Sequence, residues 1–361
     1  MILLGLLALP FVVGACAYLL TKTTITLKEY ALMTVLSALV GFGGYQIAKY
    51  GAMQDVEHWN GHITNKRHDS RSCCHCSDVC DSHDEDGNCT SSHEECSHFR
   101  DYYWLLDVST GDELGDSCTH QSTAPGWYTK AYKGEPAAVA RHYTNYLKAD
   151  PESLMTPEAE KYLDQVPPFP EVYGLYHVQR VLSKGVNVPP NWQKDLDEMN
   201  KVLGPQYQVD VLLLVTKNKD PMFAKSVEAK WLYGPKNAVT VVIGAPDGKT
   251  IDWARVVTLS EVEKLKIEIR DELPGKALDD PKILPFLQHE IKTAYSRTPM
   301  AEYEYLATAA KPTTGWTVAL YLLNLCLIIG LAVWMHQKDV FGDERWQRFR
   351  SGKRRRFGRR W

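Results

Sequence analysis

Three long stretches without Asp, Glu, Lys or Arg are the clearest pattern along the chain. They cover residues 1–20, 30–48 and 312–337. Each is long enough to cross a hydrocarbon core of about 30 Å at a helical rise of about 1.5 Å per residue. The third is rich in Leu, Ile and Val, and Trp316 and Trp334 lie near its ends, where interfacial aromatic residues are common. The pattern predicts transmembrane helices at residues 1–20, 30–50 and 314–336.

A cleaved signal is the alternative interpretation of the first stretch. Val13-Gly14-Ala15-Cys16 resembles a weak lipoprotein cleavage box. No basic residue precedes the apolar run, however, and the run continues past Ala17. The sequence therefore favours an uncleaved span, with cleavage or lipidation of Cys16 as the alternative.

Charge is distributed unevenly around these stretches. The formal charge is −3, but residues 337–361 carry +7 and residues 1–50 carry +2, which leaves −12 for residues 51–311. Basic residues next to spans are retained on the cytoplasmic side of a membrane. We therefore predict a multi-pass protein of the cytoplasmic (inner) membrane, with residues 51–311 extracytoplasmic and a basic cytoplasmic tail at residues 337–361.

The basic tail predicts a second contact with the bilayer. Its arginines alternate with aromatic residues, and such a segment can lie on anionic lipid at about 1 kcal/mol per basic residue. An anchor that binds nothing specific is the plainer alternative, and nucleic acid is the least favoured partner. The predicted lipid-contacting residues are Arg354, Arg355, Arg356, Arg359 and Arg360.

Cysteine and histidine gather in residues 51–135. Seven of the nine cysteines lie within 46 residues, and eight of the twelve histidines lie in the same region. In an oxidising compartment, clustered cysteines form disulfides that stabilise regions with small cores, so we predict disulfides of unknown connectivity. Zinc is the alternative cofactor, because thiolate and imidazole are its usual ligands. The candidate residues for disulfides or a metal are Cys73, Cys74, Cys76, Cys80, Cys89, Cys96, Cys118 and His75.

The extracytoplasmic region divides into three parts by its pattern. Residues 51–135 form the Cys/His-rich module, in which the alternation in YYWLLDV at 102–108 predicts a strand. Residues 136–190 are a polar connector, and residues 191–297 alternate between helical and β patterns. The chain is therefore predicted to be an α+β membrane protein with three transmembrane helices, a Cys-rich β-containing module and a small α/β sandwich.

Residues 191–297 carry the clearest secondary-structure signals. Asn191 is a candidate N-cap of a helix that Gly204 and Pro205 end, and Ser260 with Glu263 predicts a capping box. The apolar run at 209–216 predicts a strand covered on both faces. The other predicted elements are a helix over 223–233, strands over 238–244 and 249–257 joined by an Asp-Gly turn, and helices over 260–273 and 281–295.

This α/β segment resembles the TPM domain family. The resemblance is carried by VDVLLLVT at 209–216, Ala224, Trp231, Gly234, KNAVTVVI at 236–243 and DGK at 247–249. WAR at 253–255 stands where the family often has a glycine-rich segment. TPM domains typically sit outside the cytoplasmic membrane beside a transmembrane segment, and relatives include acid phosphatases and factors in membrane-protein maintenance. The resemblance therefore implies fold and topology more than a reaction.

A looser resemblance covers most of residues 55–155. EHWNGHITNKR, the cysteines that follow it and HYTNYLKADPESL are similar to uncharacterised membrane proteins of bacteriophages and some bacteria. This resemblance brings no function with it, and a phage-encoded protein acting at the host envelope stays a hypothesis.

Motifs for catalysis are weak. No G-x-S-x-G, H-E-x-x-H or G-x-x-x-x-G-K-[ST] pattern occurs. The candidates for a hard-metal or phosphate site, or else for turns and caps, are Asp247, Asp252, Asp279 and Asp280. The sequence favours a non-catalytic ectodomain that binds envelope or membrane proteins. A metal-dependent phosphatase-like TPM enzyme and a zinc-binding or redox ectodomain are the alternatives.

Overall fold

The computed structural model describes residues 2–21, 25–72, 76–84, 88–149 and 155–338. The chain divides into two compact units. One, here called the helical unit, comprises Met1–Gln54 and Leu306–Trp361, and the other, the α/β unit, comprises Asp55–Tyr305. The predicted lipid-contacting arginines of the tail lie outside the described residues.

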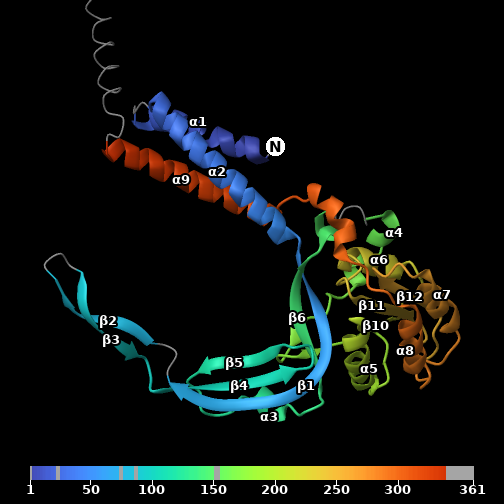
Figure 1. Cartoon of the computed structure of the whole chain (residues 1–361). Coiled ribbons are helices and arrows are strands. Elements are labelled where there is room, and N and C mark those ends of the chain that lie inside the picture. The colour runs from blue at the N-terminus through green and yellow to red at the C-terminus, as the bar shows by residue number, and fades with distance from the viewer. Residues whose placement is uncertain (1, 22–24, 73–75, 85–87, 150–154, 339–361) are drawn as a thin grey trace, which may run out of the picture. The chain divides into compact units, whose positions relative to one another are not determined.

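Three helices pack against one another in the helical unit (Figure 1). They are α1 (Ile2–Thr21), α2 (Leu27–Ala52) and α9 (Thr314–Lys338). Thr26 caps α2 through a capping box, in which its Oγ1 accepts from the Glu29 N–H at 3.3 Å and Glu29 Oε2 accepts from the Thr26 N–H at 2.7 Å. Among the described residues, α2 and α9 are long and apolar enough to cross a membrane, and the apolar stretch of α1, Leu4–Leu19, is shorter.

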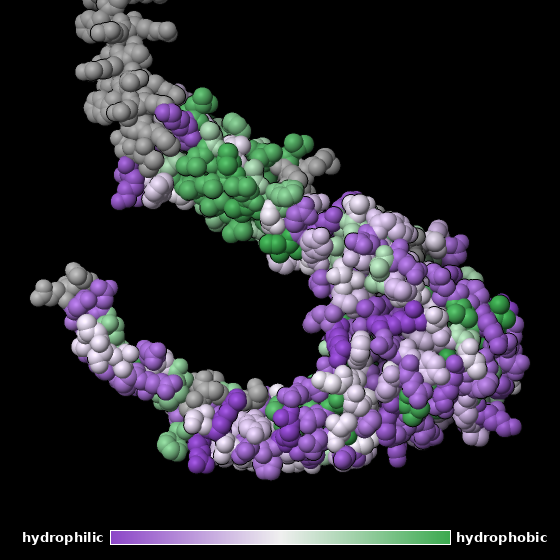
Figure 2. Space-filling model, viewed as in Figure 1, coloured by the Kyte–Doolittle hydropathy of each residue, from purple (hydrophilic) through white to green (hydrophobic). Residues whose placement is uncertain are grey.

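The helical unit exposes apolar side chains and buries polar ones. Leu39 and Leu322 are 65% and 58% exposed, whereas Ser37 and Asn324 are fully buried. Ser37 Oγ donates to the Leu6 carbonyl at 3.1 Å, and Asn324 Nδ2 donates to the Ser37 carbonyl at 3.2 Å. Polar side chains therefore join α1, α2 and α9, while the face of these helices seen in Figure 2 is largely hydrophobic.

The first sheet of the α/β unit has the strand order β5-β4-β1-β6. Its strands are β1 (Gln54–Ser72), β4 (Arg100–Val108), β5 (Glu113–Thr119) and β6 (Pro136–Thr144), and β1 and β4 run antiparallel (Figure 1). The short helix α3 (Gly126–Lys130) contributes Tyr128, which packs edge-on against Trp104 with ring centroids 5.0 Å apart. These aromatic residues form the core of this sheet together with Ile63 and Leu106, and the strand predicted at 102–108 is part of β4.

The second sheet has the order β12-β11-β10-β9. Its strands are β9 (Val181–Lys184), β10 (Asp210–Thr216), β11 (Ala238–Gly244) and β12 (Trp253–Thr258). β10 is parallel to β9 and β11, whereas β11 and β12 are antiparallel. Figure 1 labels β10, β11 and β12. Every residue of β10 and β11 is buried, so the predicted strand covered on both faces is confirmed.

Helices cover both faces of this second sheet. α5 (Trp192–Tyr207), α7 (Glu263–Glu272) and α8 (Ile283–Ala294) share one core with Leu213 and Val241. α6 (Phe223–Trp231) and the segment around Phe169 share a second core with Leu214 and Val242. Alternate residues of each strand face different helical layers. The mixed α/β architecture that the pattern predicted is therefore present.

The segment 136–190, predicted as a connector, contributes to both sheets. It supplies β6 to the first sheet and β9 to the second. Between them lie the short helix α4 (Pro157–Glu160), the 3₁₀ turns Tyr146–Ala149 and Leu163–Gln165, and the paired strands β7 (Val172–Tyr173) and β8 (His177–Val178). A third 3₁₀ segment, Met300–Thr308, follows α8.

Two local predictions for the second sheet's helices differ from the structure. α5 continues through Gly204 and Pro205 and ends at Tyr207, where Gln208 adopts a left-handed conformation. The predicted capping box is absent: Val262 is the N-cap of α7, and Ser260 Oγ instead accepts from the Ser296 N–H at 3.3 Å. Tertiary contacts outweigh the local signal at both positions.

Candidate functional site

The cysteine-rich segment forms an isolated hairpin. β2 (Cys76–His83) and β3 (Cys89–Cys96) run antiparallel, and within the described residues they form a sheet only with each other. Every residue of β3 is exposed, and β2 is exposed or half-buried throughout. Because an isolated two-stranded hairpin is marginally stable in water, this element needs additional stabilisation.

Two disulfides provide that stabilisation. Cys76 pairs with Cys96, its direct partner in the strand register, and Cys80 pairs with Cys89. Their Cα atoms lie 4.0 Å and 5.8 Å apart. The prediction that the clustered cysteines form disulfides is confirmed for these four residues. Cys118 is also disulfide-bonded, whereas Cys73, Cys74 and His75 lie outside the described residues.

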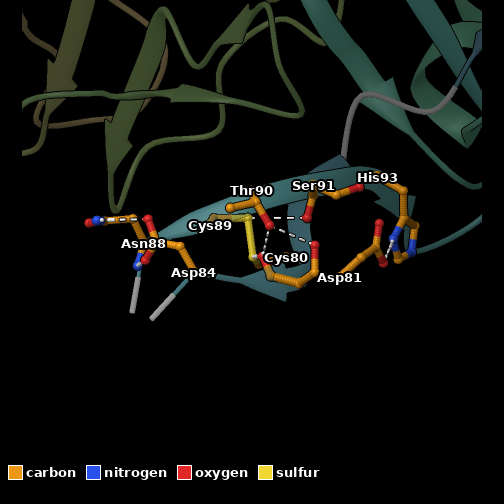
Figure 3. Close-up of a disulfide and its surroundings, with 9 residues drawn as sticks. Cys80, Asp81, Asp84, Asn88, Cys89, Thr90, Ser91 and His93 are labelled. Atoms are coloured by element: carbon orange, nitrogen blue, oxygen red, sulfur yellow. Dashed lines mark hydrogen bonds and ion pairs between the residues drawn. A yellow bond between two sulfur atoms is a disulfide. The ribbon is translucent and has the colours of Figure 1, made fainter. Parts of the chain in front are cut away.

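Side-chain hydrogen bonds add to the covalent cross-links (Figure 3). His93 Nδ1 lies 2.6 Å from Asp81 Oδ1 on the neighbouring strand. Near the turn, the Asn88 N–H donates to Asp84 Oδ1 at 2.8 Å. The hairpin is therefore held on both sides of the Cys80–Cys89 bridge, although all of these bonds are exposed to water.

The hairpin carries a high density of negative charge. Residues 76–96 contain seven acidic residues and no Lys or Arg. Asp78 lies directly opposite Glu94 in the strand register, and both side chains are exposed. Like charges directly opposite each other destabilise a strand pair. The disulfide next to this pair holds the two carboxylates together against their repulsion.

One group of potential metal ligands occurs among the described residues. Cys76, Glu94 and Cys96 place their ligand atoms within 4.8 Å of one another. Cysteine binds metal as the thiolate, and both of these sulfurs are in a disulfide. This group could hold zinc only after reduction of the Cys76–Cys96 bond.

The acidic residues predicted for a metal or phosphate site lie in turns and loops. Asp247 Oδ1 accepts from the Lys249 and Thr250 N–H groups at 2.8 Å each, and these backbone bonds lower the pKa of Asp247. Asp252 and Asp279 are exposed. Asp280 lines a cavity of about 360 Å³ that also contains Asp195 and Glu198 of α5. In the described part of the chain, none of the predicted acidic residues belongs to a group with metal-ligand spacing.

Sequence reasoning missed a buried polar cluster centred on Asp210. Asp210, the first residue of β10, is fully buried. Its carboxylate contacts His58 Nδ1 at 2.9 Å and Asn60 Nδ2 at 3.0 Å, and it pairs with the Arg180 guanidinium. Arg180 Nε also donates to Asp197 Oδ1 at 3.0 Å. The only sequence signal was one carboxylate inside the apolar run at 209–216, because the partners come from distant segments.

The partners of Asp210 determine its ionisation. Burial alone would raise the pKa of Asp210, but the positive charge of Arg180 and the hydrogen bonds from His58 and Asn60 outweigh it and lower the pKa to about 2. Asp210 is therefore a carboxylate at neutral pH. Since a carboxylate only accepts hydrogen bonds, the proton between Asp210 and His58 belongs to His58 Nδ1.

Comparisons with known proteins identify no relative. No family model, no curated protein and no solved structure matches this chain.

We expect removal of the Cys80–Cys89 bridge to loosen the hairpin alone. A disulfide that closes a short loop contributes about 2–4 kcal/mol, and no tryptophan lies within residues 76–96. In Cys80→Ser/Cys89→Ser, a protease that cuts after glutamate should cleave at Glu94 or Glu95 at least about tenfold faster. The tryptophan-fluorescence unfolding midpoint should stay unchanged. A lower midpoint would show that the hairpin contributes to the stability of the rest of the unit.

Proposed function

We propose that this protein is an integral membrane protein whose extracytoplasmic α/β unit binds a partner with a basic surface. The acidic disulfide-bonded hairpin of β2 and β3 is the binding element. The observation that carries the proposal is the Asp78–Glu94 pair, two exposed carboxylates held opposite each other beside a disulfide. An arrangement that costs stability and is exposed to solvent is better suited to recognition than to folding.

The distribution of polarity in the helical unit supports a membrane anchor of three spans. Without a hydrophobic force between helices, helices in lipid associate through close packing and hydrogen bonds. Ser37 and Asn324 supply such bonds, and the exposed leucines and isoleucines of α2 and α9 suit a hydrocarbon environment. We propose that α1 also spans the membrane, which makes three spans together with α2 and α9. We further propose that Lys338 marks the cytoplasmic end of α9, as the basic tail indicates.

The disulfides support the proposed orientation of the α/β unit. Disulfides persist in oxidising compartments and are rare in the cytoplasm. We also propose that residues 191–297 form a TPM-like domain, supported by the order of α5, β10, α6, the strands β11 and β12, and then α7 and α8. This resemblance contributes a location outside the membrane, and the binding role depends on the hairpin.

Charge reversal in the hairpin should strongly weaken partner binding. A photo-activatable amino acid at Ser77, beside the Asp78–Glu94 pair, is expected to cross-link to a discrete protein in native membranes. Asp78→Lys/Glu94→Lys should reduce this adduct at least about tenfold, because each like-charge contact at a complementary interface is costly. Raising the salt concentration should weaken the adduct of the unmodified protein as well.

The matched control carries the same photo-activatable amino acid at Lys133, an exposed residue outside the hairpin. Its expected result is no discrete adduct. A second control reverses two exposed acids on α7 and its end, Glu263→Lys/Asp271→Lys, and should leave the Ser77 adduct intact. Identical adducts from Ser77 and Lys133, or an adduct that survives reversal of the Asp78–Glu94 pair, would contradict the proposal.

A further inference from the structure

A second feature of the α/β unit is a cavity of about 590 Å³ beside His58. Its walls come from the start of β1, from β6, from the segment 168–172 and from the end of α6. Cavities of this size bind small molecules, and their walls are usually apolar with a few fixed polar groups. Here the apolar wall includes Val56, Phe169, Trp231 and Leu232.

The aromatic part of this wall is well defined. The rings of Phe169 and Trp231 meet edge to face, with centroids 5.2 Å apart. Trp231 Nε1 donates to the Pro167 carbonyl at 2.9 Å, so the indole is fixed in place. The imidazole of His58 lies 5.8 Å from the Phe169 ring centroid. An apolar ring of a ligand would therefore meet other rings beside the imidazole.

The imidazole of His58 is held in one orientation beside the cavity. Its Nδ1 donates to the Asp210 carboxylate at 2.9 Å, and its backbone carbonyl accepts from Asn237 Nδ2 at 2.7 Å. A neutral imidazole that donates from Nδ1 carries its lone pair on Nε2, on the side of the ring away from Asp210. His58 is one of the residues that line the cavity. The buried cluster therefore fixes the orientation of the ring and, in the neutral imidazole, its tautomer.

Three other polar residues of the wall, Asp55, Lys148 and Lys230, already have partners. Asp55 accepts from Asn145 at 2.7 Å and pairs with Lys148 at 2.8 Å. Lys230 donates to the carbonyls of Leu163 and Val166 at 3.0 Å and 2.7 Å. The positive charges of Lys148 and Lys230 in the wall are balanced by the negative charges of Asp55 and Glu171. The cavity thus suits a neutral ligand better than an anion, whose lone pairs would face that of Nε2.

We propose that this cavity binds a small neutral molecule with an apolar ring and a hydroxyl group, such as a phenol, and that the hydroxyl donates to His58 Nε2. This is a binding function separate from the hairpin. The ring packs against Phe169 and Trp231, and the oriented imidazole selects the hydroxylated ligand over the same ring without a hydroxyl. A ligand without the hydroxyl would leave the fixed acceptor of His58 unpaired, and this cost makes the cavity prefer the hydroxylated ligand.

The test uses 4-hydroxybenzamide and benzamide, which differ by the hydroxyl group alone. The full chain is placed in nanodiscs with 5-fluorotryptophan, and the ¹⁹F resonance of Trp231 is assigned by its loss in Trp231→Phe. We expect 4-hydroxybenzamide to shift this resonance saturably, with a Kd about tenfold lower than that of benzamide, as one hydrogen bond allows. No saturable shift with either probe would overturn the proposal.

Variants separate the role of His58 from that of the cavity. His58→Asn keeps a donor toward Asp210 but has no Nε2, so the preference for the hydroxylated probe should disappear. His142→Ala, an exposed residue of the same wall, should keep the preference. Unchanged ¹⁹F resonances of Trp104 and Trp127 report that His58→Asn is folded. If it is not, Ala140→Trp fills the cavity without touching the buried cluster and should abolish binding of both probes. An undiminished preference in His58→Asn, or undiminished binding in Ala140→Trp, would overturn the proposal.

Discussion

We expect Asp210→Ala to lower the free energy of unfolding by about 3–5 kcal/mol, the cost of removing one partner from a buried ion pair. The reason is that Arg180 is only 3% exposed and would lose its fully buried counter-ion. His58 and Asn60 would lose their acceptor in the same step. The measurement is chemical denaturation of the detergent-solubilised full chain, followed by tryptophan fluorescence.

Asp220→Ala is the matched control for this variant. Asp220 also has a pKa of about 2, set by hydrogen bonds from Lys161, the Met222 N–H and Tyr162, but its site is open to solvent. We expect only a small shift of the midpoint, because exposed ion pairs contribute little. Equal losses in the two variants would show that burial of Asp210 does not determine its importance.

We also expect the contribution of Asp210 to stability to depend on pH. The pKa of Asp210 is lowered from 3.8 to about 2 in the folded protein. Since the folded value is below the unfolded one, the contribution of this carboxylate is fully present above about pH 4 and is lost as the pH falls toward 2. The stability difference between the unmodified protein and Asp210→Ala should therefore shrink as the pH falls from about 4 toward 2.

Gly204→Ala should be the second most destabilising change. A Cβ at position 204 would lie 2.5 Å from both the Cβ and the carbonyl oxygen of Asn60, closer than real contacts allow. In a helix interior, alanine stabilises the helix relative to glycine by up to about 1 kcal/mol. Overpacking costs about 1–3 kcal/mol, so the steric term should prevail and move β1 away from α5. The measurement is the free energy of unfolding of Gly204→Ala, obtained by chemical denaturation.

Gly126→Ala is the control for this substitution. A Cβ at position 126 would meet nothing within 4 Å. We expect no loss of stability from it. If Gly204→Ala instead stabilised the protein, as helix propensity alone would require, then α5 and β1 would not make the close approach at Asn60 that the buried cluster centred on Asp210 needs.

The sequence predicted those features that depend on neighbouring residues. The apolar run at 209–216 identified β10, and the absence of charge over residues 312–337 identified α9. Clustered cysteines indicated disulfides, but the pairing of Cys76 with Cys96 required the strand register. Register is a property of the folded pair, and no spacing rule supplies it.

The buried cluster could not be predicted because its members are far apart in sequence. Asp210 lies 152 positions from His58 and 30 positions from Arg180. Each residue alone is an ordinary polar side chain near a strand. Gly204 was interpreted as a helix stop because glycine commonly follows helices. In the structure it lets the Asn60 backbone approach α5, and the helix continues for three further residues.

The most direct measurement is the oxidation state of the hairpin cysteines in membrane-extracted protein. The protein is alkylated with and without prior reduction, and the modified peptides are identified by mass spectrometry together with bound-metal analysis. We expect Cys76, Cys80, Cys89 and Cys96 to react only after reduction, and no zinc to be released. This result would place the acidic hairpin in an oxidising compartment as a disulfide-bonded binding element. Alkylation without reduction, or after chelation alone, would contradict the extracytoplasmic location and the disulfide-bonded hairpin together.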